Sequence, residues 1–225
     1  MKPACYFAWM LDLTSPSAAS IRTAAPTSSH TYQADRLVDL VAIFEPEVQV
    51  CYWPRPCNLQ IARYLMTFEP NRTSGFRQVV RSGKPVSPLS MPNLPGYDTL
   101  TSDLDFLIGV YSELLGCPAV GLRFERLNRA MCPGFHVDRL GIRLICTYHG
   151  PGTQWLGDQS IDRHQLRDID ITTTAIEEAP TFALVLLKGT LWQGNGHRGA
   201  IHRSPTVPAG IGHRVLATMD ALWSS

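Results

Sequence analysis

The stretch Cys132-Pro-Gly-Phe-His-Val-Asp138, with the apolar run Arg143-Leu-Ile-Cys-Thr-Tyr148 after it, decides how the rest of the chain is interpreted. His136 and Asp138 form an H-x-D pair. Because alternate residues of an extended strand point to the same face, the imidazole and the carboxylate are predicted to lie side by side. The run that follows, bounded by turn residues, predicts a second strand beside the first.

Residues further along the chain complete a candidate metal site. His202, 66 residues downstream, would add a second imidazole, and two histidines with one carboxylate are the ligands that leave open positions on a non-haem iron. Arg214 and Thr218 follow in the next predicted strand, where the arginine could hold a carboxylate with two hydrogen bonds. Arg143 and Tyr148 are expected to reach the same cavity.

Several alternatives stay open at this point. The same three ligands would suit zinc in a hydrolase, or in a metal-binding or sensing module without catalytic activity. His213 and His149 are competing ligands, whereas His30, His164 and His197 are expected to be exposed or to lie in loops. Cys132 and Cys146 are expected to be buried thiols, and Trp155 and Trp192 to be core or rim aromatics.

The order of the predicted elements indicates an α+β chain. Helical periodicity covers 33–44, a helix capped by Asn58 follows a short strand at 48–53, and the clearest helix starts at Thr101 and ends at Gly116. Alternating strands then follow from Val120 onwards. We expect residues 1–32 to be a flexible leader and 33–225 to be a single domain. Within it, 33–118 would be a mainly helical annex and 119–225 a β-sandwich or barrel that carries the metal site. The long stretches 70–98 and 156–179 are candidate lids.

Composition narrows the function classes. The chain has 225 residues, 44% of them hydrophobic, and a formal net charge of +1, so no excess charge favours nucleic acid or a membrane surface. Six cysteines without a C-x-x-C pair indicate free thiols, and the expected location is the cytoplasm.

Two resemblances rest on these motifs. The segments Phe-His-Val-Asp138, Thr147-Tyr-x-Gly-Pro-Gly-Thr-x-Trp155 and His202-Arg-Ser-Pro205 resemble a bacterial family of uncharacterised proteins over roughly residues 45–222. The wider pattern of His136, Asp138, His202 and Arg214 resembles the Fe(II)/2-oxoglutarate-dependent dioxygenases. That resemblance implies a double-stranded β-helix, a jelly-roll or cupin-like core.

The second resemblance also implies roles for residues. It makes His136, Asp138 and His202 the iron ligands and Arg214 the residue that binds the distal carboxylate of 2-oxoglutarate. Tyr148 becomes a second contact to that carboxylate, with Arg143 and Thr218 near the co-substrate. The reaction implied consumes dioxygen and 2-oxoglutarate, releases succinate, and oxidises a substrate that the sequence does not identify.

Overall fold

A computed structural model describes residues 30–67, 75–88, 90–157, 163, 166, 176–196 and 198–223. The elements in chain order are β1 (Thr31–Gln33), the 3-10 helix η1 (Leu37–Phe44), β2 (Val50–Trp53), α1 (Leu59–Met66), β3 (Gly75–Arg81), α2 (Tyr97–Leu115), β4 (Ala119–Leu127), β5 (Ile142–His149), β6 (Gln154–Leu156), β7 (Ile176–Glu178), β8 (Leu184–Lys188), β9 (Ile201–Arg203) and β10 (Arg214–Leu222).

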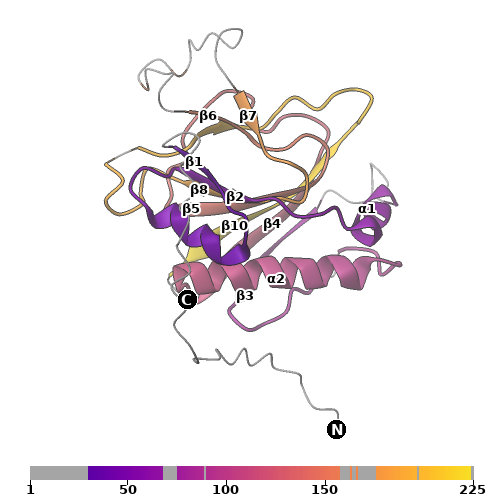
Figure 1. Ribbon diagram of the computed structural model, residues 1–225. Helices are drawn as coiled ribbons and strands as arrows, with labels where there is room; N and C mark the ends of the chain where they lie inside the picture. Colours follow the sequence, from indigo (N-terminus) through magenta and orange to yellow (C-terminus); the bar gives the residue numbers. More distant parts are fainter. Residues whose placement is uncertain are drawn as a thin grey trace, which may run out of the picture.

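Two sheets form the body of the molecule. The larger sheet has seven strands in the order β1-β2-β8-β5-β10-β4-β3, and the smaller has three in the order β7-β6-β9. Figure 1 shows α2 running along one side of the large sheet, with β6 and β7 on the opposite side. The large sheet therefore lies between a helical layer and the small sheet. The predicted α+β class is confirmed as a sheet-rich molecule with few helices.

The alternation along the central strands produces two different faces. On β5, Leu144, Cys146 and Tyr148 belong to the large apolar core that the helices cover, whereas Ile145 packs in a second cluster with Trp155 of the small sheet. Because successive side chains of a strand point to opposite faces, residues with even numbers on β5 face the helices and those with odd numbers face the small sheet.

The helices begin and end close to where the sequence predicts. Asn58 caps α1, because its side chain accepts hydrogen bonds from the backbone nitrogens of Gln60 and Ile61. Helix α2 starts at Tyr97, four residues before the predicted Thr101, and ends at Gly116, whose φ of 68° is the left-handed conformation that glycine adopts easily. In the described part of the chain, no helix is both long and apolar enough to cross a membrane.

The expected helical annex is not confirmed. Residues 33–118 contribute β2 and β3 to the large sheet, so this segment is built into the β-core. β3, inside the stretch predicted as a long connection, pairs with β4 along seven residues, from Gly75 opposite Glu125 to Arg81 opposite Ala119. Its turn-rich flanks hid this strand. Most of the other candidate lid, 156–179, and nearly all of the predicted leader lie outside the described residues.

Candidate metal centre and the adjoining cavity

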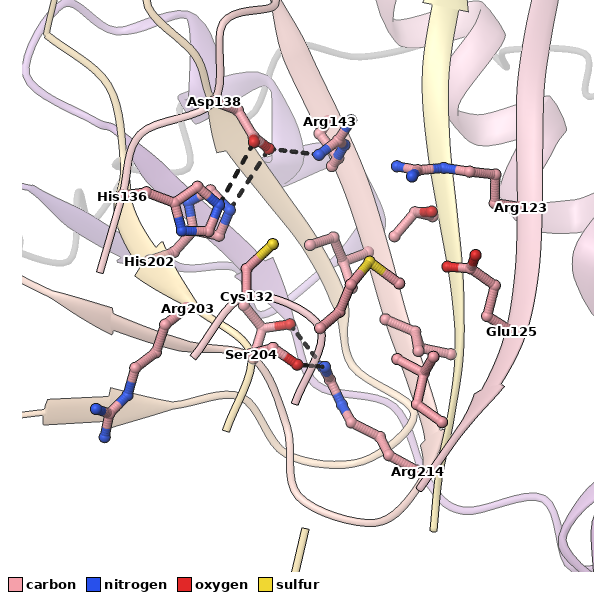
Figure 2. Close-up of a pocket in the computed structure, with 16 residues that line it drawn as sticks. Arg123, Glu125, Cys132, His136, Asp138, Arg143, His202, Arg203, Ser204 and Arg214 are labelled. Carbon is pink, nitrogen blue, oxygen red and sulfur yellow. Dashed lines mark hydrogen bonds and ion pairs between the residues drawn. The ribbon is translucent and has the colours of Figure 1, made fainter. Parts of the chain in front are cut away.

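A cavity of about 150 Å³ opens between the two sheets, and the predicted ligands lie on its wall. Its floor is made by the side chains of β4, β5 and β10 that face the small sheet. The lining residues are Arg123, Glu125, Leu127, Met131, Cys132, His136, Asp138, Arg143, Ile145, Thr153, His202, Arg203, Ser204, Arg214, Leu216 and Thr218. In Figure 2 the two histidines and Asp138 cluster together, with Arg123 and Glu125 across the cavity and Arg214 at a separate place on its wall.

His136, Asp138 and His202 form a compact group of three potential ligands. One ligand atom from each lies within 4.8 Å of the other two. The Nε2 atoms of His136 and His202 lie 3.6 and 3.5 Å from the two carboxylate oxygens of Asp138. The structure thus brings together the three residues that the sequence singled out, although His202 lies 66 residues after His136 along the chain.

Backbone contacts hold this group in place. His136 and His202 form an isolated antiparallel bridge, each donating its backbone N–H to the carbonyl of the other at 3.0 and 2.9 Å. The backbone N–H of Thr190 donates to the carbonyl of Asp138 at 2.9 Å. Gly199 has a φ of 149°, and a Cβ there would lie 2.4 Å from a methyl carbon of Val137, so a larger residue would push the H-x-D segment away. The segment is therefore held by one bridge and by loops, not by the regular strand that we predicted.

Both imidazoles are oriented for metal binding. Nδ1 of His136 lies 3.0 Å from the carbonyl oxygen of Gly134, and Nδ1 of His202 lies 2.9 Å from that of Ala200. A carbonyl oxygen only accepts hydrogen bonds, so each Nδ1 must carry the proton. In the neutral ring this leaves the lone pair on Nε2, the atom that faces Asp138. Such a carbonyl contact is the usual way in which proteins fix a metal-binding histidine.

The charges around Asp138 keep it ionised. Burial alone would raise its pKa, but the imidazoles of His136 and His202, which donate from Nε2 to the carboxylate when they are protonated, and the charge of Arg143 hold the pKa well below its usual range. The hydrogen bond to Asp138 in turn raises the pKa of His136. Arg143 donates from Nη1 to Asp138 and binds Asp220 through its two other nitrogens at 2.7 and 2.9 Å. Arg143 therefore positions a candidate ligand, and each of its three side-chain nitrogens already donates to a carboxylate.

Arg214 is the buried cation of the cavity. It is 2% exposed, and its guanidinium donates to the hydroxyls of Ser204, Thr147 and Thr153 at 3.0, 2.9 and 2.9 Å. Its Nε has no hydrogen-bond partner, and no carboxylate of the described residues forms an ion pair with it. Burial lowers the pKa of Arg214 to about 10, an effect that the charge of Glu178 opposes. An arginine surrounded by neutral hydroxyls is equipped to bind an anion.

The prediction for Tyr148 is wrong. Its ring lies in the core on the helical side, and its hydroxyl donates to Asp103 of α2 at 2.6 Å. Arg143 and Tyr148 are five positions apart in one strand, so they must point to opposite faces. Thr218 does line the cavity, but it lies four residues from Arg214 along β10, with Leu216 between them on the same face.

The other expectations are confirmed for some residues and corrected for others. Cys132 is exposed and lines the cavity, whereas Cys146 is buried as predicted. His30 is buried, not exposed. The rings of His149 and His213 contact each other in a tilted arrangement, with centroids 4.4 Å apart, and neither joins the three-ligand group. Trp155 is a core aromatic. His164 and His197 lie outside the described residues.

Sequence reasoning missed the three hydroxyls around Arg214. Thr147 shares the odd-numbered face of β5 with Arg143, and Ser204 follows His202 by two residues, so strand alternation points to both. Thr153 is brought in by the Gly150-Pro-Gly152 turn, where a Cβ on Gly152 would lie 1.8 Å from the carbonyl oxygen of Ala179. The close approach of that turn explains why glycine stands there.

Two solved dioxygenases have a fold similar to that of this chain. The rice dioxygenase for auxin oxidation is 12% identical, with a TM-score of 0.52 over 86% of this chain and 82% of that one. The Arabidopsis thaliana dioxygenase for auxin oxidation 1, solved as a 2-oxoglutarate binary complex, is 8% identical, with a TM-score of 0.50 over 87% and 93%. This chain thus shares the jelly-roll fold of 2-oxoglutarate dioxygenases.

The sequence itself belongs to a family without an assigned function. A family model described as "Protein of unknown function (DUF1826)" matches residues 34–220, which is most of the chain, so the protein belongs to that family. No curated protein matches it.

Proposed function

We propose that the protein is an Fe(II)- and 2-oxoglutarate-dependent oxygenase. One observation carries the proposal: a buried arginine without a carboxylate partner among the described residues lines the same cavity as the His-Asp-His group. A metal site by itself would fit a zinc protein equally well. A zinc hydrolase, however, has no need of a buried guanidinium held ready by three hydroxyls.

The residues present fit an iron ion bound by Nε2 of His136, Nε2 of His202 and a carboxylate oxygen of Asp138. Two imidazoles and a carboxylate are the ligands of non-haem iron oxygenases and leave positions for a chelating co-substrate. Arg214 would bind the distal carboxylate of 2-oxoglutarate, with Ser204, Thr147 and Thr153 fixing the guanidinium. When bound, iron would supply dioxygen activation; 2-oxoglutarate would lose carbon dioxide and take up one oxygen atom to become succinate, while the other oxygen atom would enter the substrate.

The test is an anaerobic titration with Fe(II) and 2-oxoglutarate. We expect a visible charge-transfer absorption that needs both components. His136→Ala should abolish metal binding. Arg214→Gln should keep the metal and weaken 2-oxoglutarate by about 10- to 100-fold, the range for losing hydrogen bonds between charged groups.

Arg203→Gln is the matched control. Arg203 lines the same cavity, but it donates to Gln154 at 2.8 Å and lies over the ring of Phe135, so its loss should leave 2-oxoglutarate binding unchanged. Zinc binding without any binding of 2-oxoglutarate would refute the oxygenase proposal and favour the zinc alternative. Equal losses in the Arg203 and Arg214 variants would refute the role given to Arg214.

A further inference from the structure

A second polar pair lies in the cavity away from Arg214. Arg123 of β4 and Thr218 of β10 are directly opposite each other in the antiparallel ladder, so their side chains are neighbours on the cavity face. Thr218 is 6% exposed, and its buried hydroxyl has no hydrogen-bond partner. A buried hydroxyl without a partner costs free energy unless a ligand satisfies it.

The guanidinium of Arg123 is also underused. Its closest acidic contact is an oxygen of Asp220 at 3.5 Å, beyond good hydrogen-bond geometry. Both oxygens of Asp220 already accept hydrogen bonds from Arg143, at 2.7 and 2.9 Å. Among the described residues, Arg123 has no hydrogen bond from its guanidinium beyond this contact. Its donors, and the hydroxyl of Thr218, thus remain for a ligand.

We propose that Arg123 and Thr218 bind a carboxylate of the substrate, so that the molecule oxidised is a small carboxylic acid with an apolar body. This inference rests on the proposed function, because it assigns the substrate of that same site. Ile145, directly opposite Thr218 on β5, and Leu216 line the cavity floor beside the pair, and Leu127 and Met131 are further apolar side chains of the cavity lining. They would contact the hydrocarbon part of the acid.

The charge of the cavity favours an anion here. Four arginines line it against the two carboxylates of Glu125 and Asp138, so the wall carries a positive excess even without a metal. A divalent metal ion would add two positive charges, and 2-oxoglutarate would add two negative charges, so the two would cancel. The positive excess therefore persists in the loaded protein and is available to an anionic substrate.

Glu125 separates the two anion sites. It lies two residues from Arg123 on the same face of β4 and directly opposite Leu216, which stands between Thr218 and Arg214 on β10. Its carboxylate is held by Arg77 at 3.2 Å. A negative group at this place repels a carboxylate that would bind between the two arginines, so 2-oxoglutarate and the substrate acid are directed to different ends of the floor.

The experiment measures binding of known acids to the protein loaded with Mn(II) and 2-oxoglutarate. The probes are hexanoate and 3-phenylpropanoate, each compared with its neutral primary amide, with isothermal titration as the readout. We expect each acid to bind about tenfold or more tightly than its amide. Arg123→Gln should weaken the acids by about 10- to 100-fold, and Thr218→Val by a few-fold, with the affinity for 2-oxoglutarate unchanged.

Arg81→Gln is the matched control, because it removes the same charge from an exposed position at the end of β3, outside the cavity lining. It should change acid binding less than about twofold, since its side chain is exposed to solvent. Thermal melting of each variant establishes that it is folded.

Several results overturn the inference: equal binding of acid and amide, no binding of either acid at millimolar concentration, or tighter binding of hexyl phosphate than of hexanoate. Loss of 2-oxoglutarate binding in Arg123→Gln would make Arg123 the co-substrate residue and would overturn it too. If wild type fails to bind 2-oxoglutarate, the proposed function fails. Acid binding to the Mn(II) protein that still depends on Arg123 would then preserve the carboxylate site.

Discussion

Arg55, which is mostly shielded from solvent, and the buried Arg214 lie on opposite faces of the large sheet and differ in their partners. Arg55, on the helical side, donates two hydrogen bonds to Asp103, at 2.7 and 3.1 Å, and a third to the carbonyl of Phe182. Burial by itself would lower the pKa of Arg55, but Asp103 raises it above the usual value. Arg214, on the cavity side, has hydroxyl partners instead, and its pKa is lowered.

The difference separates a structural ion pair from a binding group. The charge of Arg55 is neutralised inside the protein, so the pair ties α2 to the strands. Arg214, in contrast, is removed from water without a carboxylate to neutralise its charge. This desolvation costs free energy, and an incoming carboxylate would offset that cost. Burial of an arginine therefore says little about its role until its anionic partner is known.

The largest expected effect is on the paired side. Asp103→Ala should lower the free energy of unfolding by about 3–5 kcal/mol, because it leaves Arg55 buried without its partner. Arg214→Met should change it by less than about 1 kcal/mol, since a desolvated charge is removed along with its hydrogen bonds. Urea unfolding of the metal-free proteins measures both values.

Asp98→Ala, also on α2 but in its exposed first turn, is the control and should cost no more than about 0.5–1 kcal/mol. If Arg214→Met were as destabilising as Asp103→Ala, the distinction between the two arginines would be wrong.

The second effect comes from the co-substrate. At a hundredfold excess over its dissociation constant, 2-oxoglutarate should stabilise the Mn(II) protein by about 2.7 kcal/mol through binding to the folded state alone. The same concentration should give little stabilisation in Arg214→Met, because most of the affinity is lost. Thermal melting with and without 2-oxoglutarate measures this, and equal stabilisation of the two proteins would contradict the role of Arg214.

Strand alternation shows what the sequence was able to predict. His136, Asp138, His202 and Arg214 were found from residue type, order and expected strands, and the structure places all four around one cavity. The same alternation excludes Tyr148 once Arg143 is placed in the cavity, since the two positions differ in parity. That error came from assigning residues to a strand without assigning them to a face.

Other features depend on contacts between distant segments. Nothing local indicates that Arg55 meets Asp103, 48 residues away, or that Gly199 accommodates Val137. β3 was missed because glycine, proline and serine surround it and its pairing with β4 supplies the order that its own sequence lacks. The lack of hydrogen-bond partners for Arg123 and Thr218 likewise depends on how β4, β10 and β5 pair with one another, which no single stretch of sequence reveals.

Arg143 combines the two roles. It is paired with carboxylates, as Arg55 is, but one of those carboxylates, Asp138, is a candidate metal ligand. Arg143→Gln should weaken metal binding by about 10- to 100-fold, the usual effect of losing a residue that orients a ligand. Asp220→Asn is the control, because it removes the other partner of Arg143 without touching Asp138, and should change metal affinity by less than about threefold. Competition titration with a chromophoric chelator measures both affinities, and similar losses in the two variants would make Arg143 a purely structural residue.

The smallest effect tests the helical face of the large sheet, through Tyr148 on β5. Tyr148→Phe removes a hydroxyl that donates to Asp103 at 2.6 Å, but it leaves the two hydrogen bonds from Arg55 in place. We therefore expect a loss of about 1–2 kcal/mol in the free energy of unfolding, as for one buried hydrogen bond to a charged group. Binding of 2-oxoglutarate to the Mn(II) protein should be unchanged, because the ring faces the helices and not the cavity.

Thr147→Val, one residue earlier on β5, should show the reverse. It should weaken 2-oxoglutarate binding, since its hydroxyl holds Arg214 at 2.9 Å, and it should cause a smaller loss of stability. If Tyr148→Phe weakened 2-oxoglutarate as much as Thr147→Val does, the two faces of this strand would not be functionally separate.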